Sequence, residues 1–206
     1  MSPFDVILFD VGGVLLTDGW DEQERKAGAE RFNLNAGEME TRNARVMAAW
    51  DRDEMDLKHY LDETVFYEPR PFTHGEFFDY MIGQSRLLPD GAISVLAELH
   101  ASNRYLLGSL NNEPREMNEF RLGKFGLRQL FKVAFSSCYL GLRKPDPAIF
   151  HRVLDILGRP ASRILFIDDR DENIVAAAAA GLKTIHFKGQ AALRGELANL
   201  GVLGGE

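Results

Sequence analysis

Five short apolar runs are spread along the chain, and helical patterns separate the later ones. A short run that is apolar throughout is typical of a strand buried on both faces of a sheet. Strands that alternate with helices favour a parallel, doubly wound sheet, because a parallel pair needs a crossover connection. The sequence therefore predicts an α/β fold with strands at Phe4–Phe9, Arg104–Ser109, Lys132–Ser136, Arg163–Ile167 and Lys183–Phe187.

Residues 16–88 break this alternation. They hold helical patterns and no clear strand, and their charged residues are interleaved with aromatic ones. We therefore expect a helical cap at 16–88, inserted directly after the first strand, and an α/β core made of 1–15 and 89–206. The alternative is that these helices cover one face of the sheet. The expected helices are Asp21–Phe32, Ala36–Trp50, Leu57–Tyr67 and Gly75–Gln84.

Length, composition and charge narrow the function. A chain of 206 residues with 45% hydrophobic residues suits one core with an inserted subdomain. The net charge of −7 gives no electrostatic footprint for nucleic acid. The single cysteine, Cys138, excludes an intrachain disulfide. The first apolar run begins at Phe4 and none reaches the ~18 residues that a membrane helix needs, so we expect no signal peptide, no membrane partner and a cytoplasmic location.

Polar residues follow four of the predicted strands at the point where each strand ends. Taken singly, each has a structural explanation, such as a turn former, a helix cap or a solvated loop residue. The carboxyl ends of parallel strands meet at one edge of a sheet, so we expect these side chains to converge there. They are Asp10 with Gly12 and Gly13 behind it, Ser109, Lys144, and the Asp168–Asp169 pair with Asn173 behind it.

This set of residue types has a coherent chemistry. Three converging carboxylates repel one another unless a hard cation neutralises them, and Mg²⁺ prefers oxygen ligands. A carboxylate such as Asp10 can attack phosphorus and form an aspartyl-phosphate that water then hydrolyses. The Lys144 ammonium, the Ser109 hydroxyl and the backbone N–H groups of Leu110 and Asn111 would stabilise the phosphoryl oxygens. We therefore expect a Mg²⁺-dependent hydrolase acting on a small phosphorylated molecule.

The same motifs resemble those of a known family. Their order and spacing are similar to the four motifs of the haloacid dehalogenase-like (HAD) superfamily, subfamily I, whose members carry a helical cap. Within this family the motifs resemble the sugar-phosphate phosphatase branch, including α-glucose-1-phosphatase-like members, and also the N-terminal phosphatase domain of soluble epoxide hydrolases. The resemblance implies a Rossmann-like core with sheet order 5-4-1-2-3. It rests on Phe9–Leu15, Ser109, Lys144–Pro147 and Phe166–Asn173.

The resemblance also implies a role for each matching residue. Asp10 would be the nucleophile and a metal ligand, and the Gly12 carbonyl a second ligand. Asp169 would bind Mg²⁺ directly. Ser109 and Lys144 would bind the transferring phosphoryl group. Two further residues would hold metal-bound waters or the lysine, namely Asp168 and Asn173.

One position departs from the family pattern. Phosphatases of this family usually carry an Asp two residues after the nucleophile, where it protonates the leaving oxygen. Here that position is Gly12, which has no side chain. We favour a phosphatase in which another group or a water supplies the proton. The candidate groups are Asp18, His59 and His74.

Gly12 also leaves open a different hydrolase, either a dehalogenase or a phosphonatase, and a protein that only binds phosphate. A dehalogenase needs no acid, but it also needs no metal, so Asp168 and Asp169 argue against it. A phosphonatase would use a cap lysine as a Schiff base, for which Lys26 and Lys58 are the candidates. The other interpretation is a catalytically weak phosphate-binding regulatory module, against which the complete strand-end set argues.

Overall fold

A five-stranded parallel sheet forms the centre of the computed structural model, which describes residues 3–204. The strand order is β3-β2-β1-β4-β5, which is the expected order 5-4-1-2-3 read from the other edge, so the expected fold class is confirmed. The first and last two residues of the expected core lie outside the described range. The strands are β1 (Val6–Phe9), β2 (Leu106–Asn111), β3 (Val133–Ser136), β4 (Ile164–Asp168) and β5 (Lys183–His186).

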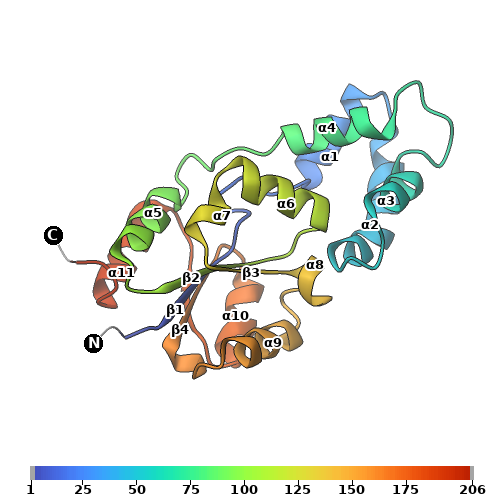
Figure 1. Cartoon of the computed structure of the whole chain (residues 1–206). Coiled ribbons are helices and arrows are strands. Elements are labelled where there is room, and N and C mark those ends of the chain that lie inside the picture. The colour runs from blue at the N-terminus through green and yellow to red at the C-terminus, as the bar shows by residue number, and fades with distance from the viewer. Residues whose placement is uncertain (1–2, 205–206) are drawn as a thin grey trace.

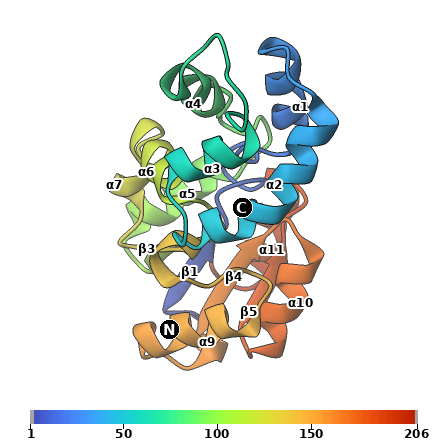
Figure 2. The ribbon, with the colours of Figure 1, turned by 90° about the vertical axis from the view of Figure 1, so that its right-hand side faces the viewer.

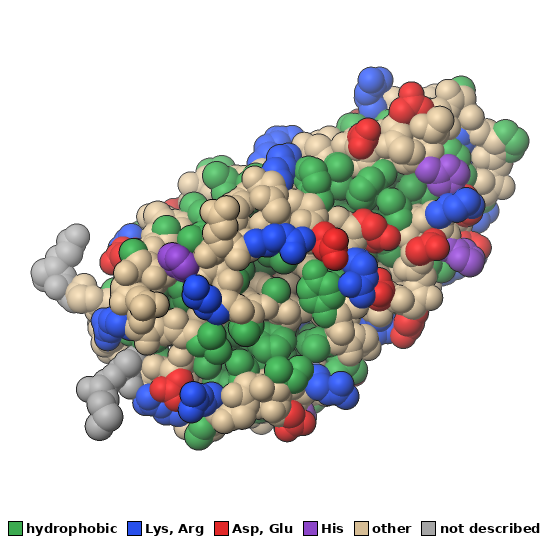
Figure 3. Space-filling view, viewed as in Figure 1, with side chains coloured by type: hydrophobic (Ala, Val, Ile, Leu, Met, Phe, Trp, Pro, Cys, Tyr) green, Lys and Arg blue, Asp and Glu red, His purple; other side chains and the backbone are tan. Residues whose placement is uncertain are grey.

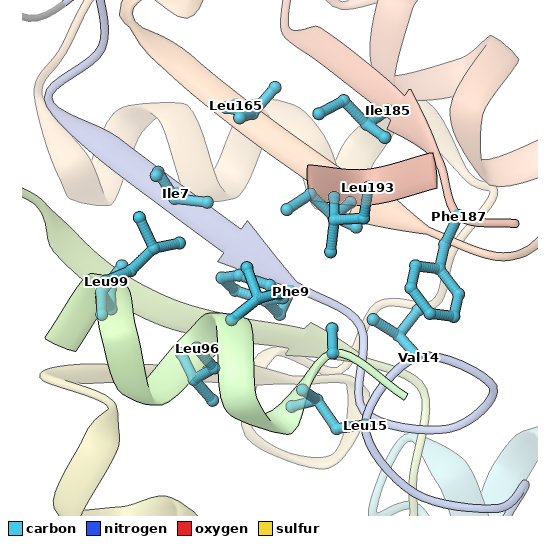
Figure 4. Close-up of a cluster of buried hydrophobic side chains, with 14 of the residues drawn as sticks. Ile7, Phe9, Val14, Leu15, Leu96, Leu99, Leu165, Ile185, Phe187 and Leu193 are labelled. Atoms are coloured by element: carbon cyan, nitrogen blue, oxygen red, sulfur yellow. The ribbon is translucent and has the colours of Figure 1, made fainter. Parts of the chain in front are cut away.

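Helices cover both faces of this sheet (Figure 1). Successive side chains of a strand point to opposite faces, and the central strand β1 is buried on both. Ile7 and Phe9 join one apolar cluster with side chains of α5 (Ile93–Ser102) and α11 (Gln190–Asn199), as Figure 4 shows. The alternate residues of β1 pack on the opposite face with α9 (Pro147–Leu157) and α10 (Asp171–Ala179). An all-apolar strand sequence is the consequence of this double burial.

The second strand runs two residues further than the sequence predicted. Its expected end was Ser109, but Leu110 and Asn111 continue the parallel pairing with β3. Asparagine is uncommon in strands, but pairing with β3 extends β2 through Asn111. Four further helical elements connect the later strands. They are α6 (Arg115–Lys124), α7 (Leu127–Leu130), α8 (Ser137–Leu140) and the 3₁₀ turn η1 (Ala161–Arg163).

Four helices between β1 and α5, together with Met117, form a third apolar cluster away from the sheet. They occupy the right-hand part of Figure 1, and Figure 2 shows α2 and α3 from that side, in front of the sheet. Trp50 stacks on Tyr60 at 3.9 Å between ring centroids inside this cluster. The helices are α1 (Glu22–Arg31), α2 (Ala36–Asp51), α3 (Leu57–Thr64) and α4 (His74–Gly83).

The sequence sets where these four helices begin. Each starts directly after a short polar residue whose side chain accepts a hydrogen bond from a backbone N–H of the first turn, which stabilises the helix start. The capping residues are Asp21, Asn35, Asp56 and Thr73.

Charged side chains of both signs alternate with apolar ones on the face drawn in Figure 3, so that face carries no continuous basic patch. Within residues 3–204, no helix is both long enough and apolar enough to cross a membrane.

Candidate active site

Asp10 directly follows β1 and lies at the carboxyl edge of the sheet. The Asp10 N–H donates to the Ile167 carbonyl over 2.8 Å, which continues the pairing of β1 with β4 for one more residue. The Val11 N–H then donates to Asp10 Oδ1 over 2.7 Å. Only 7% of Asp10 is exposed, and that part faces a cavity. One carboxylate oxygen is therefore held by the backbone while the other is directed to its neighbours.

Lys144 lies between two carboxylates. Its Nζ is 3.0 Å from Asp10 Oδ2 and 2.6 Å from Asp168 Oδ2. Asn173 Nδ2 donates to both oxygens of Asp168 over 3.0 Å, and the Arg170 N–H donates to Asp168 Oδ1 over 2.8 Å. Asp168 therefore has partners for both oxygens and acts as an anchor for the lysine.

Asn112 fixes the loop that carries this lysine. Its amide donates to the Lys144 carbonyl over 2.8 Å, and its amide oxygen accepts from the Lys144 N–H over 2.8 Å. No pattern in the sequence predicts this role of Asn112. The signal was weak because the two residues are 32 positions apart in the chain.

Burial and charge shift the pKa values of this group in opposite directions. Burial raises the pKa of Asp10 well above its ordinary range, although Lys144 opposes the shift. Burial alone would lower the pKa of Lys144, but the carboxylates of Asp10 and Asp168 raise it above its usual value. Lys144 overcomes the effect of burial on Asp168, whose pKa is lowered. Lys144 therefore stays charged, and its positive charge reduces the repulsion between the neighbouring carboxylates.

Asp169 brings a third carboxylate against the loop after β1. Gly13 has a left-handed φ of +69°, and a Cβ there would collide with the Asp169 carboxylate, so only glycine allows this approach. Burial and the neighbouring Asp168 raise the pKa of Asp169. Ligand atoms of Asp10, Asp168 and Asp169 lie within 4.8 Å of one another. Asp169 Oδ1 is buried and has no hydrogen-bond partner among residues 3–204. These three residues are able to hold a metal ion.

The other expected site residues differ in what they contact. Ser109 Oγ is buried and has no hydrogen-bond partner within the described chain. Leu110 points into the apolar core, so only its backbone is available to a ligand. Asn111 donates its amide to Glu113 over 3.2 Å and to Asn118 over 3.0 Å, so this nitrogen is already engaged. Gly12 lines the cavity beside Asp10.

A cavity of about 500 Å³ opens over Asp10. Its lining comes from the sheet edge and from the segment that leads into α1 and α2. A buried ion pair between Arg121 and Glu113 supports one wall and packs against Gly19. Of the candidate acids and lysines that the sequence offers in residues 16–88, Asp18 lines the cavity. The others do not, namely Lys26, Lys58, His59 and His74.

Asp51 is a buried acid on another wall of the cavity. It ends α2, is 2% exposed, and its Oδ2 lies 2.9 Å from Arg143 Nε. Burial raises its pKa to about 6, although Arg143 opposes the shift. This residue links α2 to the loop that carries Lys144.

This fold and this site define a hydrolase class, and the chain belongs to the haloacid dehalogenase-like hydrolase family, whose model matches residues 4–181. The family resemblance inferred from the motifs is therefore confirmed. A HAD family enzyme of Bacteroides thetaiotaomicron, solved with magnesium and inorganic phosphate, superposes with a TM-score of 0.72 at 18% identity. The match covers 90% of this chain and 95% of that chain. At that identity the likeness shows the fold.

Phosphatases are among the curated relatives. Phosphoglycolate phosphatase of Pseudomonas fluorescens (strain Pf0-1) is 27% identical over 133 residues, which are 65% of this chain and 44% of that protein. Bifunctional epoxide hydrolase 2 of Sus scrofa is 24% identical over 196 residues, which are 86% of this chain and 35% of that protein. The chain therefore spans less than half the length of these two relatives.

Replacing Asp51 should flatten the pH dependence of stability. Well below its ordinary pKa of 3.8, the carboxyl holds its proton in both the folded and the unfolded state, so it has no effect on the pH dependence of stability. Between about pH 4 and about pH 6 only the unfolded chain releases it, so the free energy of unfolding of the wild type falls as pH rises. We expect the Asp51→Asn variant to lack this fall, which amounts to on the order of 2–3 kcal/mol at pH 7.

Urea unfolding between pH 4 and pH 7.5 measures this difference. Asp155→Asn, the same change at an exposed position of α9, is the control and should keep the wild-type slope. A wild-type slope in Asp51→Asn would contradict the raised pKa of Asp51.

Proposed function

We propose that this chain is a Mg²⁺-dependent phosphatase that hydrolyses a small phosphate monoester, such as a sugar phosphate, through an aspartyl-phosphate on Asp10. The observation that carries the proposal is the contact of Lys144 Nζ with both Asp10 and Asp168, beside a third carboxylate within 4.8 Å. A lysine fixed at the nucleophile meets the oxygens of a phosphoryl group that binds there. The phosphatases among the relatives support the same reaction.

The donor set fits a magnesium ion. Asp169 Oδ1 is buried without a partner, and excess negative charge remains after Lys144 is counted against three carboxylates. Asp10, Asp169 and the Gly12 carbonyl would be direct ligands, and Asp168 would contribute through bound water. When bound, Mg²⁺ would neutralise phosphoryl oxygens and favour attack by a carboxylate.

The residues of the chain would divide the remaining work. An Asp10 oxygen attacks phosphorus, and the bond from phosphorus to the leaving oxygen breaks. Lys144 and the Ser109 hydroxyl hold the phosphoryl oxygens, together with the backbone N–H groups of Leu110 and Asn111. Asn173 keeps Asp168 in place to orient Lys144. This is positioning and charge stabilisation, which phosphoryl transfer chiefly needs.

We further propose that residues 16–88 act as the cap that selects the substrate. The cavity of about 500 Å³ has the size of a small-molecule site, and its walls include Trp20, Asn43 and Met47 from this segment. The group attached to the phosphate would lie against these walls. Substrate choice would then depend on this segment, and the chemistry on the sheet edge.

Hydrolysis of p-nitrophenyl phosphate tests the proposed reaction. We expect release of nitrophenolate that requires Mg²⁺ and stops in EDTA. Asp10→Asn should abolish it, because an amide is not a nucleophile towards phosphorus. Asp5→Asn is the matched control, since Asp5 lies just before β1 at its opposite end and pairs with Arg163. It should keep activity close to that of the wild type.

Two outcomes would contradict this proposal. Full activity in EDTA would remove Mg²⁺ from the proposed reaction. Retained turnover in folded Asp10→Asn would remove Asp10 as the nucleophile.

A second prediction concerns the metal alone. Gly13→Ala places a methyl group where the Asp169 carboxylate lies, so we expect weaker Mg²⁺ binding. Gly141→Ala is the matched control, because Gly141 has a similar φ of +66° but open space around its Cβ position. Calorimetric titration with Mg²⁺ measures both variants. Equal affinity in Gly13→Ala and in the wild type would place the ion away from Asp169.

A further inference from the structure

The proposed reaction leaves one chemical need unmet. The oxygen that leaves phosphorus is a poor leaving group as an alkoxide, so a positioned acid accelerates its departure. Gly12 supplies no side chain. The space over it is nevertheless filled, because Asp18 Oδ1 lies 2.9 Å from the position of a Cβ built on Gly12. A carboxyl group thus reaches the face of the Asp10 loop from six residues further along the chain.

Contacts on both sides hold this carboxyl in place. The Thr17 N–H donates to the Arg86 carbonyl over 2.9 Å, and the Thr17 carbonyl accepts from the Arg121 guanidinium. On the other side, the Trp20 N–H donates to Glu24 over 2.7 Å and the Trp20 indole donates to Tyr60 over 2.9 Å. The segment is therefore anchored before and after Asp18.

Gly19 lets this segment approach the wall of the cavity. A Cβ at Gly19 would collide with the Arg121 guanidinium and would lie 2.7 Å from Glu113 Oε1. Only a glycine allows the chain to pass over that buried ion pair. The turn that follows Asp18 is therefore fixed by packing, which keeps the carboxyl over Gly12.

Asp18 also differs from three other acids of the cavity in its partners. Glu113 is paired with Arg121, Asp51 is close to Arg143, and Asp21 caps α1. The Asp18 carboxylate accepts no hydrogen bond within residues 3–204, and its ion-pair partner Arg170 is 3.8 Å away. Asp18 faces the cavity and is 36% exposed, so a ligand or a water can reach it. Its carboxyl is thus available for proton transfer.

We infer that Asp18 is the general acid–base of the proposed phosphatase reaction, placed by the anchored 17–20 segment over the side-chain space of Gly12. This inference rests on the proposed function. As Asp10 attacks, the phosphorus–oxygen bond of the ester breaks, and the leaving oxygen takes the proton of Asp18. The Asp18 carboxylate then takes a proton from water. That water attacks phosphorus, the bond to Asp10 breaks, and phosphate leaves.

Rapid-mixing kinetics of Asp18→Asn with two aryl phosphates tests this role. Nitrophenolate leaves without a proton, so p-nitrophenyl phosphate should still give a burst of about one product per enzyme, followed by slow turnover. Phenolate is the more basic leaving group, so phenyl phosphate should give no burst. We expect steady-state turnover of both esters to fall by roughly 10²–10⁴-fold. Asp155→Asn, the same change at an exposed position of α9 outside the cavity lining, is the control and should keep wild-type rates.

Placing a carboxyl at position 12, where phosphatases of this family usually carry one, gives a second, independent test of Asp18. Gly12 is not among the glycines with a left-handed φ, so its backbone accepts a side chain. In an Asp18→Ala background the space over Gly12 is vacant. We therefore expect Asp18→Ala with Gly12→Asp to turn over both esters at least tenfold faster than Asp18→Ala alone.

The outcomes separate this inference from the function on which it rests. Wild-type turnover of both esters by Asp18→Asn would overturn the role of Asp18 and leave the phosphatase intact. Loss of the nitrophenolate burst in Asp18→Asn, with no recovery in the relocated variant, would also overturn it, because Asp18 would then only support the fold. No hydrolysis by the wild type would overturn both.

Discussion

A single ammonium group sits among three carboxylates at the carboxyl edge of the sheet. Lys144 contacts Asp10 and Asp168, and Asp169 lies close to both acids. Burial favours the protonated form of these acids, and the charge of Lys144 opposes that effect at Asp10 and at Asp168. A protonated Asp10 would be no nucleophile. The lysine offsets only part of the charge. The remainder favours a hard cation, which is the physical reason for proposing magnesium at this edge.

The sheet makes this concentration of charge possible. Phe9 is in register with Ile167, so the next residues of the two strands, Asp10 and Asp168, emerge side by side. The strands beneath them are buried on both faces, and Figure 4 shows the apolar cluster on one of these faces. This burial gives the acids a rigid base. Asn112 and Asn173 then use hydrogen bonds to fix Lys144 and its anchor. The pairing of β1 with β4 thus fixes the positions of Asp10 and Asp168. The loop residues hold the positive charge of Lys144 beside them.

The sequence predicted the parts of this arrangement that depend on strand periodicity. Asp10 and Asp168 follow apolar runs directly, so their convergence could be read from topology, as could the strand order. The sequence did not predict contacts that depend on loop geometry. Arg121 reaches the Thr17 carbonyl from 104 residues away, and no local pattern encodes that pairing. The approach of Asp18 to Gly12 belongs to the same class, because it depends on how a loop turns back.

The central claim is that Asp10 carries the phosphoryl group during turnover. The most direct measurement mixes the protein and Mg²⁺ with p-nitrophenyl phosphate labelled on phosphorus, quenches in acid within the first turnover, and maps the label by peptide mass spectrometry. We predict label on the peptide that contains Asp10, bound as an acyl phosphate that hydroxylamine releases. Label on a different residue, or turnover with no labelled protein at any time, would contradict the account.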